Sequence, residues 1–120
     1  GRGVERTHLT ATTKLGRVSV SSEAVAQLVG HTTAECYGVV GMASGGRLPR
    51  LLSRNKLTKG IAVVGRDDGL AIDLHVVVEY GLNLAEVAAT VRSRVVYEVE
   101  RLTGLEVVAV EVHVEDVRRG

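Results

Sequence analysis

The 120-residue chain contains no tryptophan and no phenylalanine, and its aromatic residues are limited to Tyr37, Tyr80 and Tyr97. Hydrophobic residues nevertheless make up 45% of the sequence, so the core must be built from aliphatic side chains. The scarcity of aromatic rings disfavours any binding surface that works by stacking nucleic-acid bases. The length suits one compact domain with a sizeable core and is too short for two ordinary domains.

Cysteine and long apolar runs are also scarce. The single Cys36 cannot form an internal disulfide, and the N-terminal residues contain no apolar segment of the kind found in secretory signals. Uninterrupted apolar runs, such as the one at 76–78, fall far short of the roughly 20 residues that span a bilayer. We therefore expect a cytoplasmic protein without a transmembrane segment, whose contact with the inner face of the cell membrane is at most peripheral.

A net charge of +1 leaves no general attraction for polyanions, so any contact with phosphates or anionic lipids depends on a local cluster. One such cluster exists between residues 47 and 59, where acidic residues are absent and five basic residues occur: Arg47, Arg50, Arg54, Lys56 and Lys59. Pro49 and the leucines around it predict a short helix here with a basic outer face. That face either binds an acidic or anionic partner or is simply solvated.

Hydrophobic periodicity predicts the elements around this segment. After a flexible N-terminal tail at 1–14, a strand at 16–21 leads into a helix that ends at Gly38. The basic helix is followed by a β-hairpin at 60–81, whose Asp-Gly step suits the turn between its strands.

A long helix then begins after Asn83 and ends at Gly104, because Asn suits a helix N-cap and Gly suits the left-handed position after a helix. An alternating strand at 105–117 precedes a frayed C-terminus at 118–120. The predicted order is strand, helix, GxxG, helix, strand, strand, helix, strand. We expect a single α+β domain at 15–117, a two-layer sandwich with helices on one face of a mostly antiparallel sheet.

The tetrapeptide Gly38-Val39-Val40-Gly41 raises the question of nucleic-acid binding. KH domains place a GxxG loop between two helices to hold the nucleotide backbone, and the predicted order is KH-like in part. Two apolar residues at the variable positions do not suit a phosphate clamp, however. We interpret Gly38 and Gly41 as residues of a tight structural turn, and nucleic-acid binding stays open as the alternative.

Polar side chains form the second face of the predicted sheet. If the strands at 70–80 and 105–117 are neighbours, six side chains gather there: Asp73, His75, Glu79, Glu111, His113 and Glu115. Two histidines with carboxylates can ligate a metal, but period-two alternation alone gives the same pattern on any exposed strand. We interpret this face as a surface for a partner or for self-association, formed by His75, Val77, Glu79, His113 and Glu115, and predict no metal or other cofactor.

No catalytic constellation is apparent in the sequence. Cys36 lies on the apolar stripe of the first predicted helix, where a buried thiol is inert. No Ser-His-Asp order, phosphate-binding loop or dinucleotide fingerprint stands out. We therefore predict no catalytic residues and a protein that is not an enzyme.

Five segments together extend over residues 16–117: "GRVSVSSEAVAQL", "GVVGMAS", "LTKGIAVV", "AIDLHVVVEYG" and "TGLEVVAVEVHVEDV". In this order they resemble the alkaline shock protein or Gls family, bacterial proteins of the envelope stress response. One departure is Glu111, where family members often have Asn.

The resemblance implies a small cytoplasmic, non-enzymatic protein that a membrane-protein partner can tether beneath the membrane and that can self-associate. We therefore expect an interaction module at the cytoplasmic face of the membrane. Two alternatives stay open: a KH-like RNA-binding protein that uses the GVVG loop and the basic helix, and a regulatory partner of an enzyme of lipid metabolism.

Overall fold

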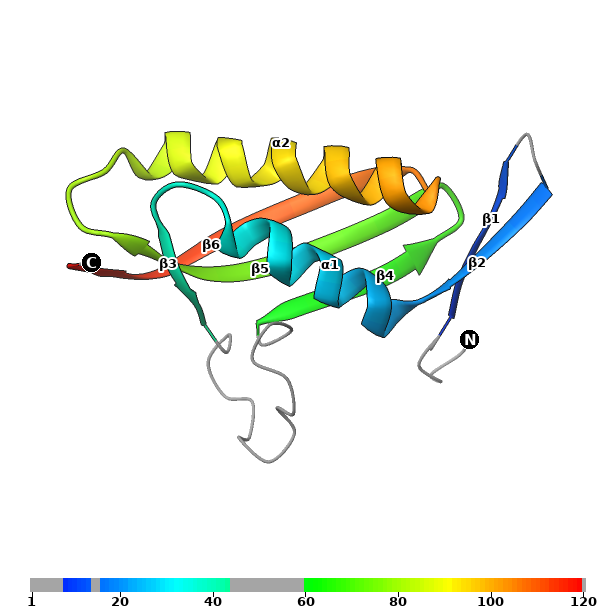
Figure 1. The fold of residues 1–120 in the computed structure, drawn as a ribbon, viewed down its shortest axis with the longest axis horizontal. Helices are drawn as coiled ribbons and strands as arrows, with labels where there is room; N and C mark the ends of the chain where they lie inside the picture. The colour runs from blue at the N-terminus through cyan, green and yellow to red at the C-terminus, as the bar shows by residue number, and fades with distance from the viewer. Residues whose placement is uncertain (1–7, 14–15, 44–59, 120) are drawn as a thin grey trace, which may run out of the picture.

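The computed structural model describes residues 8–13, 16–43 and 60–119 (Figure 1). Within these residues, two helices cover one face of a four-stranded sheet, and a two-stranded hairpin lies at one end of the domain. The predicted two-layer α+β architecture is confirmed. The predicted basic helix, within the segment at 47–59, lies outside the described residues.

The first helix, α1 (Ser22–Ala34), follows directly from strand β2 (Gly16–Ser21). The Ser21 hydroxyl accepts a hydrogen bond from the Ala24 amide at 3.0 Å, which satisfies a free donor of the first helical turn. Strand β2 pairs antiparallel with β1 (His8–Thr13). Strand β1 therefore occupies part of the segment that we expected to be a tail, because its backbone groups find partners along β2.

The sheet is built around β5 (Gly69–Glu79), which pairs with each of the other three strands. Strand β4 (Ile61–Arg66) pairs with the first half of β5 as the predicted hairpin, and β3 (Val39–Met42) pairs with the second half, so these two short strands share one edge of β5. Along the other edge, β6 (Val107–Arg118) runs parallel to β5, and its last residue, Arg118, lies in the segment that we expected to be frayed.

The parallel pairing follows from the second helix, α2 (Leu84–Thr103), which carries the chain back along the sheet before β6 begins. The Asn83 side chain accepts from the Glu86 amide at 3.0 Å, and Gly104 adopts a left-handed φ of 76°, so both predicted helix ends are confirmed. No helix in the described ranges is long and apolar enough to cross a membrane.

The core lies between the helices and the sheet and is aliphatic, as the composition predicts. Its fully buried side chains come from both helices and from β5: Val25, Val29, Leu74, Val76, Val78, Val91, Val95 and Val99. Because valine dominates this set, the core depends on close packing of small branched side chains rather than on large aromatic rings.

The segment that we expected to be a GxxG linker forms strand β3 from Val39 onwards. Gly38 adopts a left-handed φ of 93°, and its carbonyl accepts a hydrogen bond from the Glu79 amide at 2.8 Å. Gly41 lies within β3, opposite Val77, next to a register shift. The prediction of a linker was wrong from Val39 onwards, because the backbone groups of β5 at 76–78 need hydrogen-bond partners along this edge and β3 supplies them.

Candidate functional site

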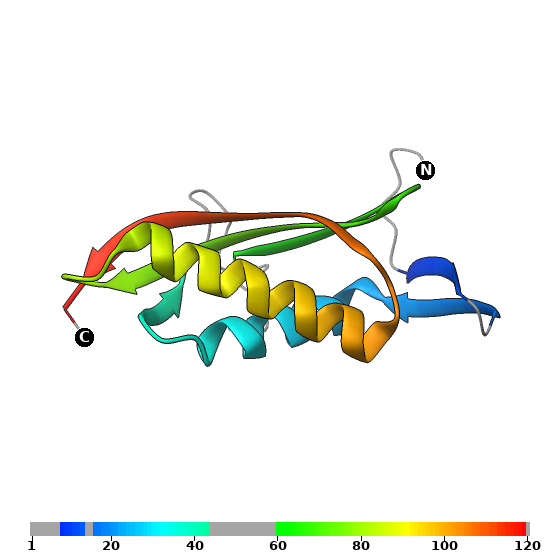
Figure 2. The same cartoon turned by 90° about the horizontal axis from the view of Figure 1, so that it is seen from above.

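The candidate site lies on the face of the sheet that is turned away from the helices. Figure 2 shows both helices on one side of the sheet. Along β5 the residues that face them are buried, whereas Asp73, His75 and Glu79 alternate with these and are half-buried. The period-two pattern of the sequence thus places the polar side chains of β5 on the outer face.

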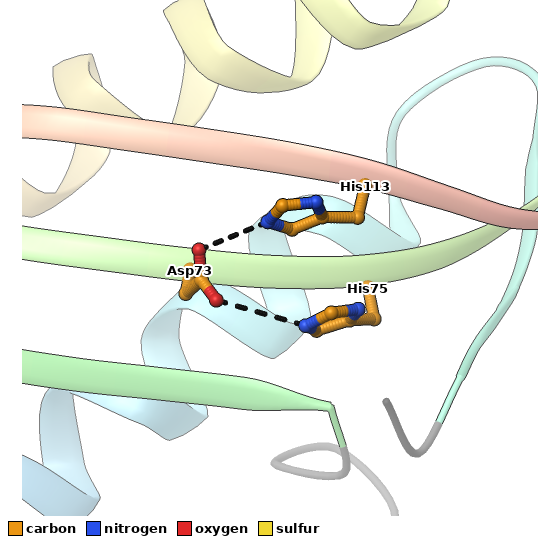
Figure 3. A group of neighbouring side chains, drawn as sticks. All are labelled: Asp73, His75 and His113. Atoms are coloured by element: carbon orange, nitrogen blue, oxygen red, sulfur yellow. Dashed lines mark hydrogen bonds and ion pairs between the residues drawn. The ribbon is translucent and has the colours of Figure 1, made fainter. Parts of the chain in front are cut away.

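Two histidines stack at the centre of this face. His75 and His113 occupy paired positions on the parallel strands β5 and β6. Their ring centroids lie 4.5 Å apart and their planes differ by 15° (Figure 3). This separation is close to the spacing of neighbouring strands, so the backbone register sets the stacking of the rings.

A single carboxylate faces both rings. One oxygen of Asp73 lies 3.1 Å from Nε2 of His113, and the other lies 3.6 Å from Nε2 of His75 (Figure 3). Glu111 also lies beside His113, with 3.7 Å between its Oε1 and the same Nε2. The Nε2 atoms of both histidines therefore point toward one acidic region of the surface.

Glu115 holds His75 at its other ring nitrogen. Its Oε2 lies 2.6 Å from Nδ1 of His75. The register between β5 and β6 shifts after Val76, which pairs with Val114, while Val77 pairs with Asp116, so Glu115 is the extra residue of a β-bulge. Because an ionised carboxylate can only accept a hydrogen bond, the short contact places the proton of a neutral His75 on Nδ1 and leaves Nε2 with a free lone pair.

An open hollow of about 360 Å³ adjoins the cluster on the same face. Alanines line much of it, and Asp73 belongs to both the hollow and the histidine cluster. Because alanine side chains end at Cβ, the sheet surface is depressed here. Its lining residues are Ala62, Val64, Arg66, Ala71, Ile72, Asp73, Ala109 and Glu111.

Apart from Glu79, which is half-buried on the outer face of β5, the predicted surface residues fall into three groups. The structure brings His75, His113 and Glu115 into one cluster and adds Asp73 and Glu111 to it. Val77, expected to be an exposed apolar contact, is only 4% exposed, so it contributes to packing instead. Its pairing opposite Gly41 of β3 could not be read from the strand pattern alone. The basic residues Arg47, Arg50, Arg54, Lys56 and Lys59 lie outside the described residues.

Gly38 and Gly41 differ in their surroundings. A Cβ atom at Gly38 would lie 2.8 Å from Cδ1 of Leu82 and 3.0 Å from Cγ2 of Val87, so this glycine packs against the start of α2. At Gly41 the nearest atom to such a Cβ would be Cβ of Val77, at an ordinary 4.0 Å. The first glycine is held inside the domain, unlike an open loop that clamps a phosphate backbone.

Cys36 is buried, and its thiol donates a hydrogen bond to the Thr32 carbonyl at 3.4 Å. Burial raises the pKa of the Cys36 thiol. The positive charge of Arg94 lowers this pKa and the negative charge of Glu35 raises it, both to a smaller extent than burial. A thiol kept protonated in this way is a poor nucleophile.

Comparison with known proteins relates the chain to several bacterial sequences. It is 34% identical over 110 residues to YloU of Bacillus subtilis (strain 168), covering 88% of this chain and 92% of that protein. It is 33% identical over 110 residues to Spy1614 of Streptococcus pyogenes serotype M6, covering 88% and 91%. No solved structure matches the chain.

A more distant relative is the stress response regulator gls24 homolog of Streptococcus pyogenes serotype M3, at 26% identity over 106 residues that cover 86% of this chain and 59% of that protein. Among protein families, residues 10–119 match the alkaline shock protein 23 family, described as having a cell envelope-related function. The resemblance to the alkaline shock or Gls group is thereby confirmed, and the chain belongs to the alkaline shock protein 23 family.

Proposed function

We propose that this protein is a non-enzymatic interaction module of the envelope stress response, which acts at the cytoplasmic face of the membrane through a membrane-protein partner. The family's cell envelope-related function and the similarity to stress response regulator homologues support the general role. The family match extends over residues 10–119, so the role concerns the α+β domain itself.

The observation that carries the proposal is the two-sided character of the sheet. The helices bury one face, while the other presents an ordered polar cluster on the adjacent strands β5 and β6. Because strands hold side chains at fixed spacing, such a face can present the same arrangement of charges to every partner molecule.

The charges of this face indicate what it binds. Four carboxylates lie on it, from Asp73, Glu79, Glu111 and Glu115, so a partner segment with lysines or arginines is complementary to it. The acid-free segment at 47–59 offers the opposite charge and forms the second proposed contact surface. Self-association through these two surfaces is part of the same proposal.

Crosslinked affinity capture from the native cells tests the proposal, with proteins and RNA identified in the same eluate. One variant reverses two charges of the sheet face through Glu79→Lys and Glu111→Lys. Another reverses the charges of the arginines in the basic segment through Arg47→Glu, Arg50→Glu and Arg54→Glu. We expect wild-type protein to recover a membrane protein that at least one of these variants loses.

The control variant combines Glu35→Lys and Glu106→Lys, which make the same charge change at exposed positions elsewhere in the domain. It should recover the partner at the wild-type level. Recovery of RNA that survives stringent washing would instead support the RNA-binding alternative. Recovery of a soluble metabolic enzyme in place of a membrane protein would contradict the proposed tethering and support the enzyme-regulator alternative.

A further inference from the structure

We propose that Asp73, His75 and His113 form a binding site for a divalent transition-metal ion, and that Zn²⁺ is the ion that fits it best. Each residue offers one ligand atom, and these three atoms lie within 4.8 Å of one another. The inference concerns an ion on the outer sheet face and does not depend on the interaction role proposed above.

The distances around Asp73 are close to those of a metal centre. In a tetrahedral site with bonds of about 2.0–2.1 Å, the ligand atoms lie about 3.3 Å from one another. The carboxylate oxygens of Asp73 lie 3.1 Å from Nε2 of His113 and 3.6 Å from Nε2 of His75. All three ligand atoms lie within 4.8 Å of one another, and both rings direct Nε2 toward this carboxylate, so side-chain rotations that shorten these distances would bring the donors to one ion (Figure 3).

The contact between His75 and Glu115 prepares the ring for a metal. In its neutral form with the proton on Nδ1, donated to Glu115 across 2.6 Å, His75 presents an unprotonated Nε2 to Asp73. That leaves two acceptors, Nε2 and a carboxylate oxygen, facing each other at 3.6 Å. A cation between them would turn this unfavourable arrangement into two ligand bonds, and a carboxylate behind a ligating histidine is a recurrent feature of zinc centres.

The pairing of β5 with β6 and the partial exposure of the three side chains also favour the binding of an ion. The two histidines stand at paired positions of adjacent hydrogen-bonded strands, so little backbone ordering is required on binding. The side chains of His75, His113 and Asp73 are 23%, 40% and 46% exposed, which leaves a path for the ion and room for a water as the fourth ligand.

The donor types select the class of metal. Two imidazole nitrogens and one carboxylate suit Zn²⁺ and its neighbours in the transition series, whereas Mg²⁺ and Ca²⁺ prefer sites made of oxygen. Glu111 and Glu115 add two carboxylates beside the ligands and increase the attraction for a cation.

Titration of the metal-free full chain with Zn²⁺, in competition with a chromophoric chelator, tests the site. We expect one Zn²⁺ per chain at this site, and Co²⁺ in its place should give the intense visible absorption of a tetrahedral centre. His113→Gln and Asp73→Asn each remove one ligand and should lower the affinity by more than the roughly 10–100-fold that loss of an outer-shell partner costs.

Two further variants separate this site from adventitious binding. His31→Gln removes an exposed histidine on α1, outside the cluster, and should leave Zn²⁺ affinity unchanged. Glu115→Gln keeps all three ligands and should weaken binding by about 10–100-fold. Circular dichroism verifies that each variant is folded. The proposal is overturned if folded His113→Gln and Asp73→Asn bind Zn²⁺ as wild type does, or if His31→Gln loses binding to the same extent.

Discussion

The two faces of β5 differ in burial and in the chemistry of their side chains. Toward the helices, Ile72, Leu74 and Val76 are at most 2% exposed and are interchangeable in chemistry, if not in shape. On the outer face, Asp73 and His75 form specific polar contacts and remain partly exposed. One strand thus supplies the stability of the domain from one face and a chemically distinct surface from the other. Substitutions on the two faces should therefore have different consequences.

The largest effect is expected on the helix-covered face. Leu74→Ala removes a side chain that is fully buried and should lower the free energy of unfolding by about 2–5 kcal/mol, because it leaves a cavity among tightly packed neighbours. Urea denaturation measures this loss. Val64→Ala on β4 is the control, since this side chain is 55% exposed and its truncation should cost less than about 0.5 kcal/mol. Equal losses would show that the two faces do not differ in their contribution to stability.

A smaller effect is expected where β3 joins the sheet, and it distinguishes a packed turn from a nucleic-acid clamp. Gly38→Ala should cost about 1–3 kcal/mol, because an L-residue is strained at a φ of 93° and its Cβ meets Leu82. Gly41→Ala should be neutral or stabilising by up to about 1 kcal/mol, since its Cβ has ordinary space. Thermal unfolding of both variants makes the comparison, and equal stability would contradict the packing of Gly38.

Among the residues that the structure describes, the core contains one ionisable group, the thiol of Cys36, and its effect on stability depends on pH. Burial raises the pKa of the Cys36 thiol above the ordinary value of about 8.5, so the unfolded chain releases this proton at lower pH than the folded chain. The stabilisation that the buried thiol contributes is fully present below the pKa of Cys36 in the unfolded chain. It decreases as the pH rises toward the pKa of Cys36 in the folded chain. Urea denaturation from neutral pH up through the thiol's titration range should show a steeper loss of stability in wild type than in Cys36→Ala. Parallel curves would mean that the thiol titrates alike in both states.

Local sequence patterns were sufficient to predict α2 and the buried face of β5, because helix capping and strand alternation each depend on residues that are close in the sequence. Capping at Asn83, the end of α2 at Gly104 and the alternation along β5 depend on neighbouring residues only. The pairing of β3 with β5 and of β1 with β2 depends on which strand edges are free. This is a property of the assembled sheets.

The outer-face cluster was only partly predictable for the same reason. Alternation placed His75 and His113 on one face, but their stacking requires the parallel register of β5 and β6. Glu115, which contacts His75, lies at the bulge after Val76. A bulge has no local signal in this valine-rich strand, so the sequence predicted the composition of the cluster without its geometry.

The smallest effect on stability is expected at Glu115, although its contact with His75 is short. Glu115→Gln should change the free energy of unfolding by less than about 1 kcal/mol in chelator-treated buffer, because a contact to a charged group at a partly exposed position gains little over solvation by water. Urea denaturation with and without excess Zn²⁺ measures the difference. Added Zn²⁺ should stabilise wild type more than the variant at the same concentration, because an ion that binds only the folded chain stabilises it according to its affinity. A loss as large as that of Leu74→Ala without metal would instead make the outer cluster a structural element, and the contrast between the two faces would fail.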